Sequence, residues 1–458
     1  MLDITLTVFY TFIALGTLVT FHEFGHFWVA RRCGVRVEQF SIGFGKALFK
    51  WHDKQGTEFI FAILPLGGYV RMLDERAGDV PPEDVSFAFN RKSPLQRLAI
   101  ISAGPIANFL LAGMIFWFMF LGGERGLLPV IGEIKPASIA QQSGFESGMK
   151  IVDIAGNPTD SWGSVSRELF DYIGTSGNIP FSVTYPDSAI RYELLVPVVD
   201  WLVSEEAPMP LRTLGISPPF VLDALSISRV VEGAAGDRAG LLANDQLLAV
   251  NDVAITSVSA FIDQVSDSTG ESLKLSVERL NEEGAVSNLE IYATPESVLR
   301  EGRQVGQLGV QLSSSVSYPE SLITEIEYGP ISALPRAFQE VVDNCIFVVK
   351  SVGKLVSGNL SPKNLSGPIT IAKVAGDTAR SGIDNFIRFV AILSIMLGVM
   401  NLMPIPVLDG GHIVFILVEV IKGSPVSERI QLVGYKAGFA MLISLMIFAT
   451  FNDLMRPF

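Results

Sequence analysis

The sequence predicts a polytopic α-helical membrane protein with four transmembrane helices, a membrane-associated β-hairpin and two tandem β-rich domains. Apolar residues make up 49% of the 458 residues and charged residues only 18%, a balance typical of membrane proteins. Four apolar segments are long enough to span a bilayer. Between the second and third lie about 260 mostly polar residues with frequent turn signals, which predict the β-rich part.

The four predicted spans lie at residues 4–30, 98–121, 388–408 and 437–451. At about 1.5 Å per residue the first exceeds the roughly 30 Å hydrocarbon core, and it is too long for the apolar core of a signal peptide. Pro404 and Pro406 break the helical pattern within the third apolar block. We therefore expect a multi-pass protein that retains its first span.

Basic residues predict the orientation of these spans. Three follow the first span and three precede the second: Arg31, Arg32, Arg36, Arg91, Lys92 and Arg97. Because loops rich in Lys and Arg stay in the cytoplasm, residues 31–97 are predicted to be cytoplasmic. Both termini and the long polar stretch then lie on the opposite side.

The predicted cytoplasmic segment contains a β-hairpin over residues 37–73. Its apolar residues alternate with period two on either side of a turn at Asp53–Gly56. Such a hairpin could pack on the lipid surface, or it could present an edge to an extended peptide. We place Ile42 at such an edge.

The polar stretch contains an internal repeat. With a shift of 96 residues, Ser143–Gly156 aligns with Ala239–Asp252, glycine on glycine and apolar on apolar. The two modules are predicted at residues 127–215 and 220–312, and they resemble PDZ domains of the bacterial type. That resemblance implies a groove that accepts a C-terminal peptide by strand addition. A rigid spacer or size filter is the alternative.

Residues 330–385 form the last distinct region. Apolar residues recur there at helical spacing, which predicts a surface or interfacial helix that holds the outer modules to the membrane. The net charge of -13 argues against a nucleic-acid partner. The two cysteines, Cys33 and Cys345, give neither a disulfide framework nor a CxxC metal site.

The first span carries three ionisable residues in the pattern His-Glu-x-x-His: His22, Glu23 and His26. On a helix the two imidazoles lie one turn apart on the same face and can bind one zinc ion, while the glutamate is placed to act as a general base. A structural role as polar groups near the interface is the alternative. Because one central charge costs about 2.5–3.5 kcal/mol in a membrane, these groups need partners, and a metal provides one.

A catalytic zinc ion takes a third protein ligand and leaves one position open. The third apolar block offers Asp409, which precedes two glycines, and the weaker candidate His412. The glycines allow the backbone to turn the carboxylate inward.

The chain resembles the site-2 protease family of intramembrane zinc metallopeptidases over nearly its whole length. The motifs are HEFGH at 22–26, GPIANF at 104–109, SGPITIAKVAG at 366–376 and NLMPIPVLDGG at 401–411. The resemblance implies zinc ligands His22, His26 and Asp409, and Glu23 as the base. It also implies a substrate-binding role for Asn401 and for five hairpin residues, Gly43, Phe44, Gly45, Gly67 and Gly68. Asn108 would pack or hydrogen-bond beside the site.

The family's activity, as the resemblance implies it, is regulated intramembrane proteolysis. Its substrates are single-span membrane proteins, such as an anti-sigma factor already cut outside the membrane and leftover signal peptides. The expected location is the bacterial inner membrane, with the termini and both PDZ-like modules periplasmic. Cleavage near the cytoplasmic side would release a product that activates an envelope stress response.

Two other functions fit the same residues. One is a PDZ-bearing membrane scaffold whose zinc is structural, in which Glu23 would be dispensable. The other is a membrane zinc peptidase that acts on soluble or lipid-linked peptides, whose substrates need no span.

In a spanning substrate the helix hides its carbonyls in its own hydrogen bonds, so it must unwind before cleavage.

Overall fold

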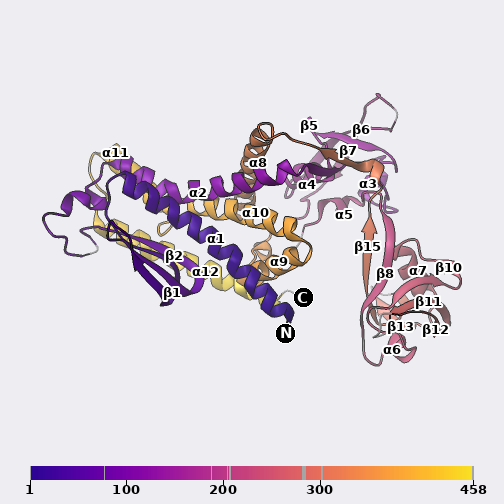
Figure 1. Cartoon of the computed structure of the whole chain (residues 1–458). Helices are drawn as coiled ribbons and strands as arrows, with labels where there is room; N and C mark the ends of the chain where they lie inside the picture. Colours follow the sequence, from indigo (N-terminus) through magenta and orange to yellow (C-terminus); the bar gives the residue numbers. More distant parts are fainter. Residues whose placement is uncertain are drawn as a thin grey trace.

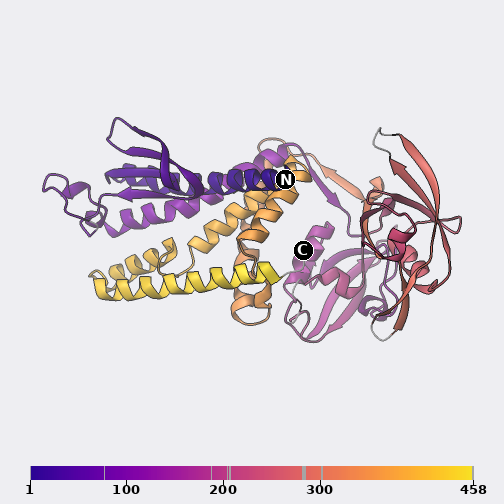
Figure 2. The ribbon, with the colours of Figure 1, turned by 90° about the horizontal axis from the view of Figure 1, so that it is seen from below.

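The protein consists of a helical part and two β-rich modules. The computed structural model describes residues 2–76, 78–186, 188–203, 205, 208–280, 285–300 and 303–455. The predicted ranges of both modules therefore include a few residues outside this description. In the helical part, both termini lie at the end next to the modules, and α11 (Asp409–Lys422) lies at the far end (Figures 1 and 2).

Four helices are long and apolar enough to cross a membrane, as predicted. They are α1 (Leu2–Arg32), α2 (Pro94–Leu121), α10 (Ile383–Asn401) and α12 (Glu428–Met455). The start of α2 is a capping box, in which Ser93 accepts a hydrogen bond from the backbone of Gln96 and Pro94 occupies the first turn. Helices α1, α2 and α10 pack together, whereas α12 stands apart from α1 and α2 over most of its length (Figure 2).

The third and fourth spans differ from the predicted ranges. Helix α10 ends at Asn401 instead of residue 408, and a loop of irregular backbone leads from there to α11. Pro404 and Pro406 lack the N–H groups that a continuing helix needs, and Val407 adopts a positive φ of 108°. Helix α12 begins at Glu428, before the predicted 437, because its charged first turns continue the helix beyond the apolar segment.

The predicted hairpin consists of β1 (Val37–His52) and β2 (Glu58–Met72), and it folds back on itself. Ile42 lies opposite both Phe61 and Gly68, so residues 39–42 are paired on both sides. The placement of Ile42 at an edge is therefore wrong. The outer strand of this sheet is Gly68–Met72, which pairs with no further strand in the described chain.

The hairpin is anchored to the end of α1. The Arg31 guanidinium pairs with the Asp53 carboxylate in the turn and donates to the Thr57 hydroxyl at 2.7 Å. The ring of Phe27 packs against Phe40 and Phe59, with centroids 5.3 and 5.6 Å away. These contacts fix the hairpin relative to the helix that carries the histidines.

The two β-rich modules share a run of elements in the order helix, strand, strand, helix, strand, strand, which is α3 to β7 in the first and α6 to β12 in the second. The first contains α3 (Ile139–Gln142), β4 (Lys150–Ile154), β5 (Asn157–Pro158), α4 (Trp162–Phe170), β6 (Gly177–Thr184), β7 (Tyr192–Val198) and α5 (Pro210–Leu214). The second contains β8 (Val221–Val230), α6 (Ala235–Arg238), β9 (Gln246–Val250), β10 (Val253–Ala254), α7 (Val258–Asp267), β11 (Leu273–Leu280), β12 (Val286–Ala293) and β15 (Val310–Ser317). From α3 to β6 and from α6 to β11, corresponding elements begin 96 residues apart, which is the offset of the sequence repeat, and β7 and β12 begin 94 residues apart.

Each module has its own core. The sheet orders are β5-β4-β6-β7 and β12-β11-β9-β8-β15, with β10 on β9. Fully buried residues such as Ile151 and Phe181 fill the first core, and Ile227 and Val250 fill the second. A hairpin of β13 (Glu296–Arg300) and β14 (Arg303–Gln307) precedes β15. A short ladder of β3 (Glu124–Leu127) and β16 (Ile323–Ile326) joins the module segment to the helical part.

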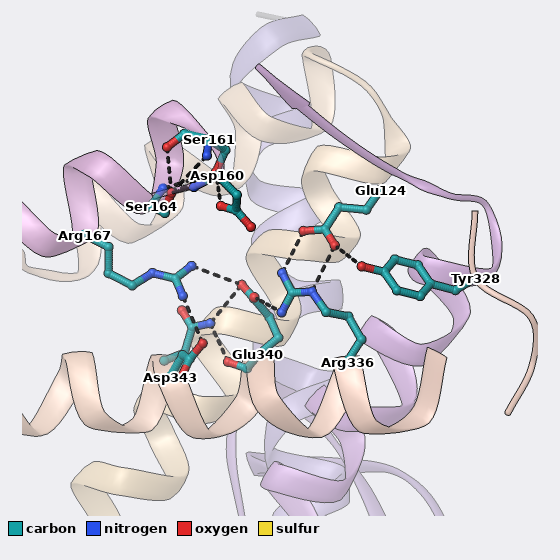
Figure 3. Close-up of polar contacts among 10 residues, drawn as sticks. Glu124, Asp160, Ser161, Ser164, Arg167, Tyr328, Arg336, Glu340 and Asp343 are labelled. Carbon is teal, nitrogen blue, oxygen red and sulfur yellow. Dashed lines mark hydrogen bonds and ion pairs between the residues drawn. The ribbon is translucent and has the colours of Figure 1, made fainter. Parts of the chain in front are cut away.

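Helix α8 (Ala333–Val356) connects the first module to the spans. One face packs through Ala337 and Val341 into a core with Phe116 and Phe120 of α2. Another face carries the charged cluster of Figure 3, in which the Arg336 side chain pairs with Glu124 and Glu340.

The charged cluster continues into the first module. Arg167 of α4 lies 3.6 Å from the Glu340 carboxylate and 3.2 Å from that of Asp343. The Phe170 and Phe347 rings pack beside it, with centroids 4.5 Å apart. The region predicted at 330–385 thus contains two helices, α8 and α9 (Pro368–Arg380), and α8 lies between the module and the spans.

The end of α12 is fixed to α9. The Asp453 carboxylate is fully buried and accepts hydrogen bonds from the backbone N–H groups of Gly367, Ile369 and Thr370 at 2.9–3.0 Å. A carboxylate that accepts the free N–H groups of a first turn stabilises the helix start.

Candidate metal centre

The site begins where α1 and α2 approach closely. A Cβ atom at Gly25 would lie closer than 3.0 Å to the Ala103 backbone, and one at Gly104 would lie as close to the His22 and His26 rings. The two glycines therefore allow the helices to pack with both imidazoles between them. The carbonyl of Ile100 accepts a hydrogen bond from His26 Nδ1 at 2.8 Å, which orients that ring.

Asp409 completes a group of three buried donor atoms. His22 Nε2 and His26 Nε2 are 3.2 Å apart, and they lie 3.3 and 3.4 Å from Asp409 Oδ2. A tetrahedral zinc ion with bonds of about 2.0–2.1 Å requires ligand atoms about 3.3–3.4 Å apart. The three atoms therefore occupy three corners of a zinc-sized tetrahedron. Asp409 Oδ2 is buried without a hydrogen-bond donor among the described residues, which fits a metal ligand.

The loop before α11 explains how Asp409 reaches the histidines. Cβ atoms at Gly410 and Gly411 would lie closer than 3.0 Å to the carbonyls of Met403 and Ile405. Only glycines allow the first turn of α11 to pack this tightly on the loop, which places Asp409 at the helix start.

Glu23 lies beside the donors and faces the hairpin. Both histidines, Glu23 and Asp409 line a cavity of about 1230 Å³, and the outer strand residues Gly68 and Met72 line it as well. A Cβ atom at Gly68 would lie 3.1 Å from Glu23 Cγ. The cavity is thus bounded by the candidate base on one side and a strand edge on another.

The other predicted residues lie at different distances from this centre. His412 also lines the cavity, but its Nδ1 is 3.3 Å from the Tyr435 hydroxyl and it is not one of the three donors. Asn401 ends α10 and is not among the cavity-lining residues of the described chain. Gly43 and Gly45 have positive φ values of 92° and 91°. The Phe44 ring covers Gly67 and is half exposed.

Sequence reasoning missed an ion pair at the cavity wall. The side chains of Arg97 on α2 and Glu419 on α11 form it, and they are 10% and 16% exposed. The sequence signal was weak, because only a charged residue within a span needs a partner, and Arg97 lies just before the predicted second span while Glu419 lies beyond the predicted third. Arg97 had been used only to predict orientation, and the pairing with Glu419 depends on how α11 folds back.

Comparison with known proteins identifies the class. Residues 10–445 match the family described as Peptidase family M50, and the chain belongs to it. The resemblance to site-2 proteases is therefore confirmed, and the chain is a protease of that family.

Individual relatives are similar to this chain over nearly their whole length. The Regulator of sigma-E protease RseP of Escherichia coli K12 is 42% identical over 97% of both chains. Protease RseP of Yersinia pestis is 43% identical, again over 97% of both chains. A Vibrio cholerae protein named as a zinc metalloprotease is 39% identical with the same coverage. The match thus extends over the helical part and both modules.

Proposed function

We propose that this chain is an intramembrane zinc endopeptidase that cleaves single-span membrane proteins by regulated intramembrane proteolysis. The observation that carries the proposal is the zinc-sized triangle of His22 Nε2, His26 Nε2 and Asp409 Oδ2. It lies between candidate membrane spans and lines the same cavity as Glu23. Membership of family M50 and the name of the Vibrio cholerae relative support zinc.

The residues divide the chemistry of peptide hydrolysis among them. His22, His26 and Asp409 would hold the ion, which supplies Lewis acidity toward the scissile carbonyl when bound. Glu23 would take a proton from the attacking water and then deliver it to the leaving amine. His412 contacts Tyr435 instead, so the fourth position is left for water and substrate.

The outer strand Gly68–Met72 is the proposed binding edge for the substrate. The N–H of Leu73 donates to the carbonyl of Arg36 at 2.9 Å, toward β1. Because backbone N–H groups alternate sides along a strand, the N–H groups of Met72 and Val70 point toward the cavity. An unwound substrate segment that pairs there would recover hydrogen bonds lost from its helix. In this scheme Gly43, Phe44, Gly45 and Gly67 shape the sheet, and Asn401 contacts the substrate backbone.

The orientation follows from the basic residues. Residues 31–97 would be cytoplasmic, and both termini and the two modules would be periplasmic in a bacterial inner membrane. The cavity is lined by Arg76, Arg97 and Arg429, in agreement with an opening toward the cytoplasm. The names of the Escherichia coli and Yersinia pestis relatives favour a substrate of the anti-sigma-factor type, already cut in the periplasm, and a released product that activates a stress response. Signal-peptide remnants have the same single-span form.

The modules would act before the chemistry. The order of strands and helices that they share supports two copies of one PDZ-like module. They would either bind the new C-terminus of a trimmed substrate or exclude bulky ectodomains. Adding a large folded domain to the periplasmic end of a model substrate separates the two roles. A size filter would block cleavage of the bulky substrate, whereas a peptide-binding groove would respond only to a free C-terminus.

Replacing Glu23 with Gln tests the proposed activity. In detergent or vesicles, the cleavage rate of Glu23→Gln should fall by about 10²–10⁴-fold, which is the contribution of a general base. Its zinc content should stay unchanged. The matched control is Glu428→Gln, which removes another carboxylate of the same cavity. Absence of cleavage in both Glu23→Gln and wild type would favour a scaffold with structural zinc, and equal cleavage by the two would show that Glu23 is not the base. Preference for a soluble peptide of the same sequence would favour the other class of peptidase.

A further inference from the structure

A buried asparagine lies beside the site, with one atom of its side-chain amide next to a histidine nitrogen and the other unpaired in the described chain. Asn108 on α2 is fully buried, and its Nδ2 lies 3.2 Å from His22 Nδ1. Its Oδ1 is buried and has no hydrogen-bond partner in the part of the chain that the structure describes. Its backbone carbonyl accepts a hydrogen bond from the Ser394 hydroxyl of α10 at 2.9 Å, so the residue is held between two helices.

The two histidines need the same protonation pattern to bind a metal. An imidazole that binds through Nε2 carries its proton on Nδ1 and must donate that proton to an acceptor. For His26 the acceptor is the Ile100 carbonyl. For His22 the neighbouring group is the Asn108 amide, and an N–H facing Nδ1 would force the proton onto Nε2.

A half-turn of the Asn108 amide removes this conflict. It exchanges Oδ1 and Nδ2, so the unpaired oxygen becomes the acceptor for His22 Nδ1–H. Either orientation leaves one amide atom without a partner, so the protonation of His22 decides between them.

We propose, on the basis of the zinc site of the proposed function, that Asn108 is a positioning residue. Its Oδ1 accepts the Nδ1–H of His22 and thereby keeps the lone pair of Nε2 directed at the metal. The backbone carbonyl of Ile100 does the same for His26. One histidine is therefore oriented by the main chain of α2, and the other by a side chain two turns further along the same helix.

Zinc affinity measured by competition with a chelating dye tests this role. Asn108→Leu has a similar size and no acceptor, and it should weaken zinc binding by about 10–100-fold, as removal of such outer partners does. Asn108→Asp keeps an acceptor and should bind zinc within about threefold of wild type, because either carboxylate oxygen can accept. Ser394→Ala, the control, removes the hydroxyl that contacts the same residue but leaves the amide, and should not change the affinity.

Wild-type affinity in Asn108→Leu would overturn the inference while leaving the proposed function intact. Absence of zinc binding in the wild type would overturn the proposed function itself. Because Asn108→Leu can fail to fold, ¹⁵N-histidine NMR of the zinc-loaded wild type provides a second measurement. A protonated Nδ1 on His22 is expected, and an unprotonated Nδ1 would contradict the role of Asn108.

Discussion

At the scale of single residues, the site depends on how closely two helices approach. Gly104 has the two histidine rings directly over its Cα, so any side chain there occupies the volume of the imidazoles. Gly113, about two and a half turns further along α2, has only ordinary van der Waals space around it, with the nearest atom 3.9 Å away. The two positions form a matched pair for testing the approach.

Gly104→Ala should abolish zinc binding and cleavage, because the new methyl group would displace the His22 and His26 rings from their common centre. Gly113→Ala should behave like wild type, and it removes the same flexible residue type from the same helix. Zinc stoichiometry and cleavage of a single-span substrate are the measurements. Full zinc occupancy in Gly104→Ala would show that the helices can separate without loss of the site.

The chemical identity of the site residues could be predicted from the sequence, but their supports could not. His22, Glu23 and His26 form a local motif, and Asp409 stands out as an acid within an apolar block. The structure brings the two imidazoles and Asp409 together. The resemblance placed Asn108 beside the site, but its partner His22 and the contact of Gly104 with the two rings follow from no local pattern, because these neighbours are distant in the chain. Asn401 was predicted from resemblance alone, and its contact with substrate stays a prediction.

At the scale of elements, the hairpin shows which features of a strand can be predicted from the sequence pattern. Alternating apolar residues and a turn at Asp53–Gly56 predicted two strands, and β1 and β2 are present. The pairing of residues 39–42 on both sides depends on positive φ at Gly43 and Gly45, which bends the chain back. Period-two patterning carries no information about that bend, so Ile42 was misplaced and the outer strand was missed.

Met72→Pro should slow cleavage of a spanning substrate by at least about tenfold, because it removes an N–H that points toward the cavity while the ladder to β1 keeps its bonds. Zinc binding should be unaffected, since Met72 is not one of the three donor residues. Met72→Leu keeps the N–H and serves as the control. An unchanged cleavage rate in Met72→Pro would mean that the substrate does not pair with this strand.

At the scale of the whole molecule, α8 is the element that joins the first module to the spans. Its amphipathic pattern predicted a surface helix, and Phe338 is indeed 71% exposed. Its other faces are covered by α2, α10 and α4, which no sequence pattern specified. The charged cluster of Figure 3 shows two carboxylates, Glu124 and Glu340, sharing Arg336.

Arg336→Ala should destabilise this junction far more than Arg125→Ala. The Arg336 pair with Glu124 is about one quarter exposed on each side, whereas the Arg125 pair with Glu325 is largely exposed. We expect the free energy of unfolding of Arg336→Ala to fall by more than about 1 kcal/mol, the loss for an exposed ion pair. The fall should be smaller than the about 3–5 kcal/mol lost when a buried pair is broken. Thermal unfolding midpoints in detergent measure both variants, and equal midpoints would contradict the role of Arg336.

The same junction should respond to acid. Burial raises the pKa of the Glu124 carboxyl, but hydrogen bonds from Arg336 and Tyr328 outweigh it and hold that pKa below its ordinary value of 4.5. A carboxyl whose pKa is lowered by folding stabilises the folded state above its unfolded pKa, and that stabilisation is lost as the pH falls. The midpoint difference between wild type and Arg336→Ala should be constant above pH 4.5 and shrink below it. A difference that persists in acid would mean that Glu124 contributes little.

The separation of the donors along the sequence affects how the protein is made. The histidines lie near the start of the chain, and Asp409 follows about 380 residues later. At synthesis rates of about 5–20 residues per second, a ribosome needs roughly 20–80 s to produce the acidic donor after the histidines have emerged. During that interval the nascent chain carries only two of the three metal donors, and it lies in a membrane that contains many spanning helices. Under the proposed function, hydrolysis starts only after Asp409 has joined the two histidines, which protects the newly inserted chain and its neighbours at the translocon.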